Sequence, residues 1–181
     1  MVLVTARPAV QPMSASIRIL GIDPGSRITG WGIIDVSGQR ITHIANGQIR
    51  TDGSDFPARL EQIFDGTREI VEDYQPEEVA IERVFMHRNA DSALKLGQAR
   101  AAAICATFAK RAGIHEYAAR EVKLAVVGTG AADKTQVQHM VGALLSLRRT
   151  LQADSADALA VAICHANQRR TRALLSRSLG K

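Results

Sequence analysis

Apolar residues recur with two different spacings along the chain, which divides it into a strand-rich first part and a longer part dominated by helical patterns. Three short apolar runs in the first part predict β-strands over Ile17–Asp23, Thr29–Val36 and Arg40–Arg50. The turn signals Pro24-Gly25 and Ser37-Gly38 lie between these runs. Connections this short predict an antiparallel meander.

Beyond this meander, helical spacing alternates with short apolar runs. A helix is expected over Asp55–Tyr74, with Asp55 as its N-cap and Gln75-Pro76 at its end. The elements expected after it are a strand Val79–Glu82, a helix from about Asn89 to Ala112, a strand Ile114–Ala118, a helical turn Arg120–Val127, a helix Asp133–Leu145 and a last helix from Asp154 to about Gln168.

This order predicts an α/β fold with a mixed five-stranded sheet, in which three antiparallel strands are followed by two strands reached through helical crossovers. Helices are expected on both faces of the sheet. Ligands in such sheets bind at strand ends where the strand order reverses, so Asp23 and Glu82 are expected to be neighbours there. Residues 1–16 are expected to form a flexible N-terminal extension, with Met13 as an alternative start, residues 17–168 one domain, and residues 169–181 a basic, disordered tail.

Composition and charge narrow the function classes. A chain of 181 residues with 46% hydrophobic and 23% charged residues is a globular domain with a full core. No apolar run reaches the roughly 18 residues that span a bilayer, and the N-terminus lacks a signal-peptide pattern. Two cysteines in predicted helix interiors are typical of a protein in the reducing cytoplasm.

The net charge of +5 favours a polyanionic partner, although a solvated basic surface is the alternative. Basic residues follow the Glu82 strand and precede the last acidic pair, which fits a phosphate-bearing substrate. They are Arg83, His87, Arg88, Lys95, Arg100, Arg120, Lys123 and Lys134.

Four carboxylates end or begin predicted elements: Asp23, Glu82, Asp154 and Asp157. Asp23 and Glu82 end apolar strands, where a carboxylate is costly to desolvate unless a cation meets it. Asp154 and Asp157 are three residues apart and therefore project from one helix face. Converging carboxylates repel one another without divalent ions between them, so the pattern predicts a metal site.

Each motif also has a plainer interpretation. The hairpin from Gly21 to Gly30 is similar to the opening of actin-like kinases and ATPases, and Asp154 alone would serve as a helix cap. Phe85, just past Glu82, could stack on an exposed base or be a buried loop aromatic. The segment from Gly128 to Gly130 lacks the spacing of a phosphate-binding P-loop and is expected to be a turn between helices.

Five segments together resemble the RuvC family of Holliday-junction resolvases, over about Ile17 to Ala166. The segments are Gly21-Ile-Asp-Pro-Gly-Ser-Arg, Ala80-Ile-Glu-Arg-Val-Phe-Met, Asn89-Ala-Asp-Ser-Ala-Leu-Lys-Leu-Gly-Gln-Ala-Arg100, Lys134-Thr-Gln-Val-Gln-His-Met140 and Gln152-Ala-Asp-Ser-Ala-Asp-Ala-Leu159. The sequence departs from the family pattern at Arg83, where a neutral residue is expected, and at Ala101, where glycine is expected.

The resemblance implies a ribonuclease H-like fold and a homodimer that cuts four-way DNA junctions symmetrically, during recombination and repair, with two Mg²⁺ ions per subunit or with Mn²⁺. It implies that the four carboxylates are metal ligands, that Lys123 and Lys134 are basic residues of the active site, and that Phe85 probes the junction. The expected DNA contacts are Phe85, Arg88, Arg83, Lys123, Lys134 and Arg120. The RuvA–RuvB branch-migration complex is the further partner that the family implies.

The expected reaction is hydrolysis of two DNA phosphodiesters by two metal ions roughly 4 Å apart, leaving 5′-phosphate nicks. Three alternative functions remain. An actin-like ATPase would need a longer chain, and a non-catalytic junction-binding protein would not need the four acids. The third is an RNA-acting nuclease of the YqgF type. The helix from Asn89 to Ala112 carries apolar residues on more than one stripe, which favours a dimer interface over burial within one subunit.

Overall fold

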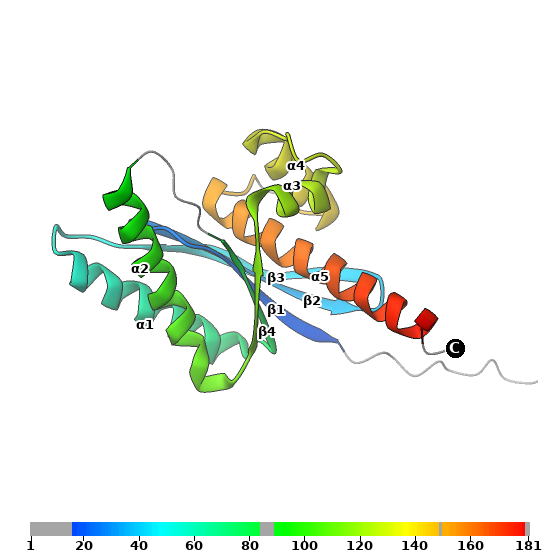
Figure 1. Ribbon diagram of the computed structural model, residues 1–181, viewed down its shortest axis with the longest axis horizontal. Helices are drawn as coiled ribbons and strands as arrows, with labels where there is room; N and C mark the ends of the chain where they lie inside the picture. Colours follow the sequence, from blue (N-terminus) through cyan, green and yellow to red (C-terminus); the bar gives the residue numbers. More distant parts are fainter. Residues whose placement is uncertain (1–15, 84–88, 149, 180–181) are drawn as a thin grey trace, which may run out of the picture.

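The computed structural model describes residues 16–83, 89–148 and 150–179 and has a five-stranded mixed sheet between two helical layers (Figure 1). The strands are β1 (Ile17–Asp23), β2 (Ile28–Ser37), β3 (Arg40–Arg50), β4 (Glu78–Glu82) and β5 (Gly113–Tyr117). The helices are α1 (Phe56–Tyr74), α2 (Ala90–Thr107), α3 (Ala119–Val127), α4 (Lys134–Leu144) and α5 (Ala153–Leu179), with a short 3-10 helix η1 (Phe108–Lys110) after α2.

The order across the sheet is β3-β2-β1-β4-β5. β2 pairs antiparallel with β1 and β3, whereas β4 lies parallel to both β1 and β5. Parallel neighbours need a crossover connection, which α1 and α2 supply on one face of the sheet, and α5 covers the other face (Figure 1). The predicted α/β class and mixed sheet are therefore confirmed.

Alternate residues of β1 face opposite helical layers, as the two-residue period of a strand requires. Leu20 and Ile22 pack into the core that α1 and α2 cover, and Ile19 packs into the core beneath α5. All three are fully buried or nearly so. Asp23 is in phase with Ile19 and therefore lies on the α5 face.

Glycines in β1 and β2 allow α5 to lie directly on the sheet. A Cβ atom added at Gly21 would lie 2.1 Å from the carbonyl oxygen of Ala158, and one at Gly30 would lie 2.0 Å from that of Asp154. Real Cβ atoms do not approach an oxygen that closely, so these two positions require glycine. The first turns of α5 are consequently held against the ends of β1 and β2.

The last helix is longer than predicted. The sequence indicated an end near Gln168 and a disordered basic tail over residues 169–181, but α5 continues to Leu179. The segment after residue 168 contains no proline or glycine before Gly180 and is rich in Arg and Leu, which are good helix formers. Figure 1 shows this end of α5 projecting past the sheet, and Leu174 and Leu175 are exposed on it.

Two other predictions have clear outcomes. α2 begins after an Asn89 N-cap, as expected, but gives way at Phe108 to η1 instead of continuing to Ala112. The predicted turn between helices is confirmed, since Gly128 caps α3 with a positive φ of 81°. Residues 1–15 of the extension predicted over residues 1–16 lie outside the described residues, as do Phe85 and Arg88.

Among the helices within the described ranges, none combines the length and the apolar composition that crossing a lipid bilayer requires.

Candidate active site

The sheet places Asp23 at the centre of a row of residues that crosses several strands. Asp23, the last residue of β1, pairs with Gly30 of β2, and Gly30 pairs in turn with Gln48 of β3. On the other side of β1, Ile22 pairs with Ile81 of β4. Glu82, the next residue of β4, therefore ends its strand beside Asp23, as the predicted strand order required.

The first turns of α5 bring the other two carboxylates to the same place. Because Gly30 has no side chain, the backbone of Asp154 lies directly over it. Asp157 follows one turn later on the same helix face and is 23% exposed. Two strand ends and one helix start, which are far apart in the sequence, thus meet at one end of the sheet.

A pocket of about 280 Å³ opens at this point. Its charged lining residues are Asp23, Glu82, Asp157, Lys123 and Lys134, and Ala119, Val122 and Val137 complete its wall. The lysines come from α3 and from the first residue of α4. Asp154 is not among the lining residues, but the Gln48 Nε2 atom donates a hydrogen bond of 2.5 Å to its Oδ2 atom.

Burial and mutual repulsion change the protonation of these acids. Burial, followed by the charges of Glu82 and Asp157, raises the pKa of Asp23 to about 8. Burial also raises the pKa values of Glu82 and Asp157, and the lysines oppose the shift in both cases. In the absence of a cation the pocket therefore disfavours having all its carboxylates charged at once.

Lys134 is the cationic group closest to these acids. Its Nζ atom lies 3.4 Å from the Oδ2 atom of Asp157, and its side chain is 80% exposed. The charge of Asp157 raises the pKa of Lys134, so this lysine remains protonated at neutral pH. Lys123 also lines the pocket, and its charge partly opposes the rise in the pKa values of Glu82 and Asp157.

The donor atoms fit a hard divalent cation. The acids of the pocket together with Asp154 offer only carboxylate oxygens, and no histidine or cysteine is among the described lining residues. Mg²⁺ and Mn²⁺ prefer such oxygen donors. A divalent ion would also relieve the repulsion that raises the pKa of Asp23, so the residues present fit the predicted metal.

Two positioning contacts were not predicted from the sequence. Gln48 orients Asp154 from β3, and its own Oε1 atom accepts a hydrogen bond from Arg50 at 2.6 Å. Arg100 of α2 donates from Nε to the backbone carbonyl of Glu82 at 3.0 Å and forms an ion pair of 2.9 Å with Glu116. The sequence contained polar alternation near the end of β3, but the pairing of β3 with β2 was needed to connect it to Asp154.

Of the predicted DNA contacts, some line the pocket and others lie outside it. Lys123 and Lys134 line it. Arg83 is exposed just past Glu82 and donates to the carbonyl of Glu116 at 3.3 Å. Arg120 is exposed near the start of α3, and its side chain lies against Gly130. Phe85 and Arg88 lie outside the described residues, so the geometry places neither.

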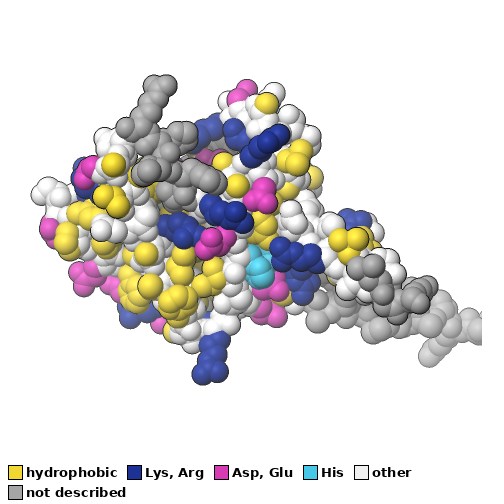
Figure 2. All heavy atoms as spheres, viewed as in Figure 1, with side chains coloured by type: hydrophobic (Ala, Val, Ile, Leu, Met, Phe, Trp, Pro, Cys, Tyr) yellow, Lys and Arg dark blue, Asp and Glu magenta, His cyan; other side chains and the backbone are white. Residues whose placement is uncertain are grey.

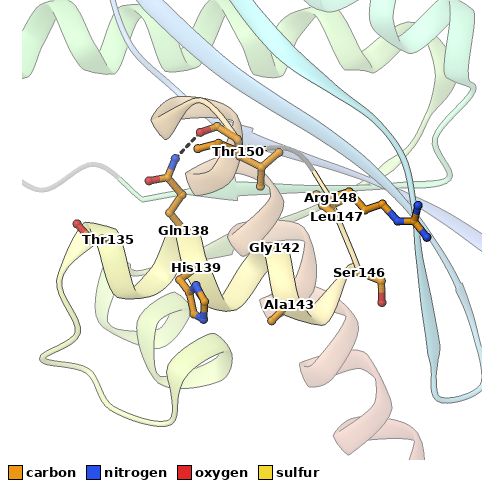
Figure 3. Close-up of a pocket in the computed structure, with 10 residues that line it drawn as sticks. Thr135, Gln138, His139, Gly142, Ala143, Ser146, Leu147, Arg148 and Thr150 are labelled. Atoms are coloured by element: carbon orange, nitrogen blue, oxygen red, sulfur yellow. Dashed lines mark hydrogen bonds between the residues drawn. The ribbon is translucent and has the colours of Figure 1, made fainter.

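A second pocket of about 480 Å³ lies between α4 and the segment that leads into α5 (Figure 3). No carboxylate lines it within the described chain, so it is not a candidate cation site. The Gln138 side chain donates a hydrogen bond to the carbonyl of Leu151, marked by the dashed line in Figure 3. This bond connects the helix that carries Lys134 to the segment that precedes Asp154.

Comparison with known proteins places this chain in a family. The family model described as "Crossover junction endodeoxyribonuclease RuvC" matches residues 19–165. Proteins of the same description from Methylococcus capsulatus and Shewanella pealeana are 59% and 60% identical to the chain. The alignments cover 88% and 81% of this chain and 96% and 85% of those relatives.

Solved structures give the same result. The structure described as "T. thermophilus RuvC in complex with Holliday junction substrate" aligns with a TM-score of 0.80 and 31% identity, over 86% of this chain and 96% of that one. The yeast mitochondrial Holliday junction resolvase Ydc2 aligns with a TM-score of 0.59 at 11% identity, covering 88% of this chain and 86% of that one, and this likeness concerns the fold alone.

Proposed function

The chain belongs to the RuvC family of crossover junction endodeoxyribonucleases, and we propose that it resolves Holliday junctions by metal-dependent hydrolysis at the pocket described above. The observation that carries this proposal is the convergence of Asp23, Glu82 and Asp157 with two lysines. Carboxylates whose pKa values are raised by burial and by one another suit a site built for divalent cations.

We assign Asp23, Glu82, Asp154 and Asp157 as the ligands that would hold two Mg²⁺ ions, with Mn²⁺ as a substitute. Such ions, when bound, activate a water molecule and stabilise the departing 3′ oxygen, so that the products carry 5′ phosphates. Gln48 restrains one carboxylate oxygen of Asp154, Oδ2, by its hydrogen bond. Arg100 holds the carbonyl of Glu82 and thereby the end of β4.

Lys123 and Lys134 would act on the substrate itself. Both side chains line the same pocket as the carboxylates of Asp23, Glu82 and Asp157, so a DNA phosphate bound there would meet their ammonium groups. A positive charge there offsets the negative charge that develops on the phosphate oxygens during hydrolysis. Asp157 keeps Lys134 oriented and protonated, because the two groups lie 3.4 Å apart.

The wider DNA contacts are assigned to basic groups around the pocket. Arg83, just past β4, and Arg120, near the start of α3, are exposed, and phosphate contacts from such groups supply most of the affinity for DNA. Arg88 and Phe85 are assigned from the family resemblance, with Phe85 stacking on an exposed base at the junction centre.

A homodimer would provide the two matched cuts that a four-way junction needs. α2 buries Ala99 and Ala103 against the body of its own subunit, while Leu94 of α2 and Phe108, the first residue of η1, are 68% and 58% exposed. Figure 2 shows hydrophobic side chains gathered over the region of α2. An apolar surface of this kind on a helix supports its use as the contact between subunits.

The remaining assignments follow from the family. The RuvA–RuvB branch-migration complex is the expected partner, because it delivers and moves the junction on which a resolvase acts. The expected location is the cytoplasm, where bacterial DNA is recombined.

The decisive experiment compares three substrates with the purified protein in Mg²⁺: a synthetic four-way junction, a linear duplex of the same sequence, and a matched RNA duplex. Selective, paired cutting of the junction is expected. Cutting of RNA alone would favour an RNA-acting nuclease of the same fold, and binding without cutting would indicate a non-catalytic junction-binding protein.

A matched variant separates chemistry from binding. Asp157→Asn removes one proposed metal ligand and should abolish cutting while junction binding in a gel-shift assay stays within a few fold of wild type, since binding rests on basic side chains. Normal cutting by this variant in Mg²⁺ would contradict the site assignment.

A further inference from the structure

A second cluster of ligand-type side chains lies at the opposite end of the interface between β4 and α5. Glu78 begins β4 and is in phase with Glu82, four residues and about 13 Å further along the strand. His165 lies eight residues after Asp157 on α5, which is about 12 Å along the helix axis. The cluster is therefore separate from the candidate active site.

Three elements contribute one ligand each to this cluster. Glu78 comes from β4, His115 from β5 and His165 from α5, and their ligand atoms all lie within 4.8 Å of one another. The Oε2 atom of Glu78 is 2.5 Å from the Nε2 atom of His165. The ring of His115 stacks on that of His165, with 4.2 Å between the centroids and 26° between the planes.

A further contact fixes the orientation of His165. The hydroxyl of Tyr117 lies 2.7 Å from its Nδ1 atom, in a buried position, so that the opposite nitrogen faces Glu78. Histidines that bind metals usually make such a hydrogen bond with their second nitrogen. Arg169 donates to the Oε1 atom of Glu78 at 3.2 Å, which leaves Oε2 directed at His165.

A hydrogen-bonded chain from Tyr117 through His165 to Glu78 would be complete without a metal. That chain does not use His115, whose ring nitrogens have no hydrogen-bond partner within the described residues. His115 is only partly buried, so its ring is accessible to solvent. His115 therefore adds a third ligand to the oriented pair of His165 and Glu78.

We infer that Glu78, His115 and His165 form a second divalent-cation site, of the zinc class, midway along α5 and about 12 Å along the helix axis from Asp157. Two imidazoles and one carboxylate suit Zn²⁺ or a similar transition metal, whereas Mg²⁺ prefers oxygen donors alone. The fourth position would be open to water or to a ligand from solvent. Such an ion would tie β4, β5 and α5 together.

Zinc binding to the purified protein tests this inference without reference to DNA cutting. Zn²⁺ is titrated calorimetrically in excess Mg²⁺, so that the carboxylate pocket is occupied by the ion it prefers. One Zn²⁺ per chain is expected. His115→Phe keeps a ring to stack on His165 but removes the ligand nitrogen, and it should weaken Zn²⁺ binding at least tenfold.

His139→Phe is the matched control, because His139 is an exposed histidine on α4 outside the cluster; its Zn²⁺ affinity should equal that of wild type. Glu78→Gln, which removes a different ligand, should also weaken Zn²⁺ binding at least tenfold. Thermal unfolding in a chelator establishes that each variant is folded. Failure to bind one Zn²⁺, or binding that His115→Phe leaves unchanged, would overturn the proposal, whatever the outcome of the junction-cutting assay.

Discussion

Asp23 is the residue at which burial and charge repulsion act together most strongly. The folded, metal-free protein holds a proton on Asp23 up to a pKa of about 8, whereas the ordinary value is 3.8. Between these values the folded state binds more protons than the unfolded state. The free energy of unfolding of the metal-free protein therefore falls as the pH rises through this range.

Removing this charge should stabilise the metal-free protein. Asp23→Asn is expected to raise the melting temperature in a chelator by about 4–8 °C at pH 8, which corresponds to about 2 kcal/mol. The gain should be smaller at pH 5, where the wild-type carboxyl is protonated. Asp73→Asn, on the exposed side of α1, is the control and should leave the melting temperature unchanged at both pH 8 and pH 5. Equal gains for Asp23→Asn at both pH values would contradict the assignment.

Lys134 should affect chemistry more than binding. If its ammonium group offsets charge on the scissile phosphate, Lys134→Ala should lower the single-turnover cutting rate on the order of 100-fold while junction affinity changes only a few fold. Lys110→Ala is the control, since Lys110 is an exposed cation in η1. Equal losses from the two variants would indicate a diffuse electrostatic surface instead.

At the level of elements, the approach of α5 to the sheet depends on glycine. The Cβ atom of an alanine at position 30 would lie 2.0 Å from the backbone oxygen of Asp154. Backbone cannot yield as a flexible side chain does, so the start of α5 would have to move away from Asp23. A single methyl group at position 30 of β2 would therefore disturb the candidate active site, although β2 contributes no carboxylate to it.

Gly30→Ala should consequently lose both stability and activity. We expect a loss of about 2 kcal/mol or more in the free energy of unfolding, as for other overpacked sites, and a much larger relative loss of cutting. Gly142→Ala is the matched control, because a Cβ there meets no atom within 4 Å and alanine favours a helix. Chemical denaturation and junction cutting measure the two effects. Wild-type cutting by Gly30→Ala would show that the position of α5 is not critical.

At the level of the whole molecule, the outer side of α2 is the strongest argument for a dimer. Leu94 of α2 and Phe108, the first residue of η1, are exposed there, while the inner side of α2 already packs into the core of its own subunit. A two-fold dimer would cover this surface and give each junction two active sites.

Sedimentation at micromolar concentration should therefore give a species of about 39 kDa, which is twice the chain mass of 19.5 kDa. Leu94→Glu should shift the protein toward monomer, since an unpaired charge is costly to bury. Leu174→Glu, an equally exposed change on α5, should not. A wild-type monomer that still makes paired cuts would contradict the dimer.

Local patterns in the sequence determined much of this protein. Short apolar runs ended by Asp23 and Glu82 predicted both the strands and the place of the acids, because strands and turns of this kind depend on residues that are neighbours in the sequence. The spacing of Asp154 and Asp157 likewise predicted one helix face. The motifs around these acids were specific enough to indicate the family.

Contacts between distant segments were decided only by the tertiary structure. Gln48 reaches Asp154 because β3 pairs with β2 in one register, and no local pattern specifies that register. Glu78, His115 and His165 are separated by tens of residues and meet only because β4, β5 and α5 pack together. The physical reason is the same throughout: periodicity sets which side of an element is buried, but packing sets which residues of different elements face one another.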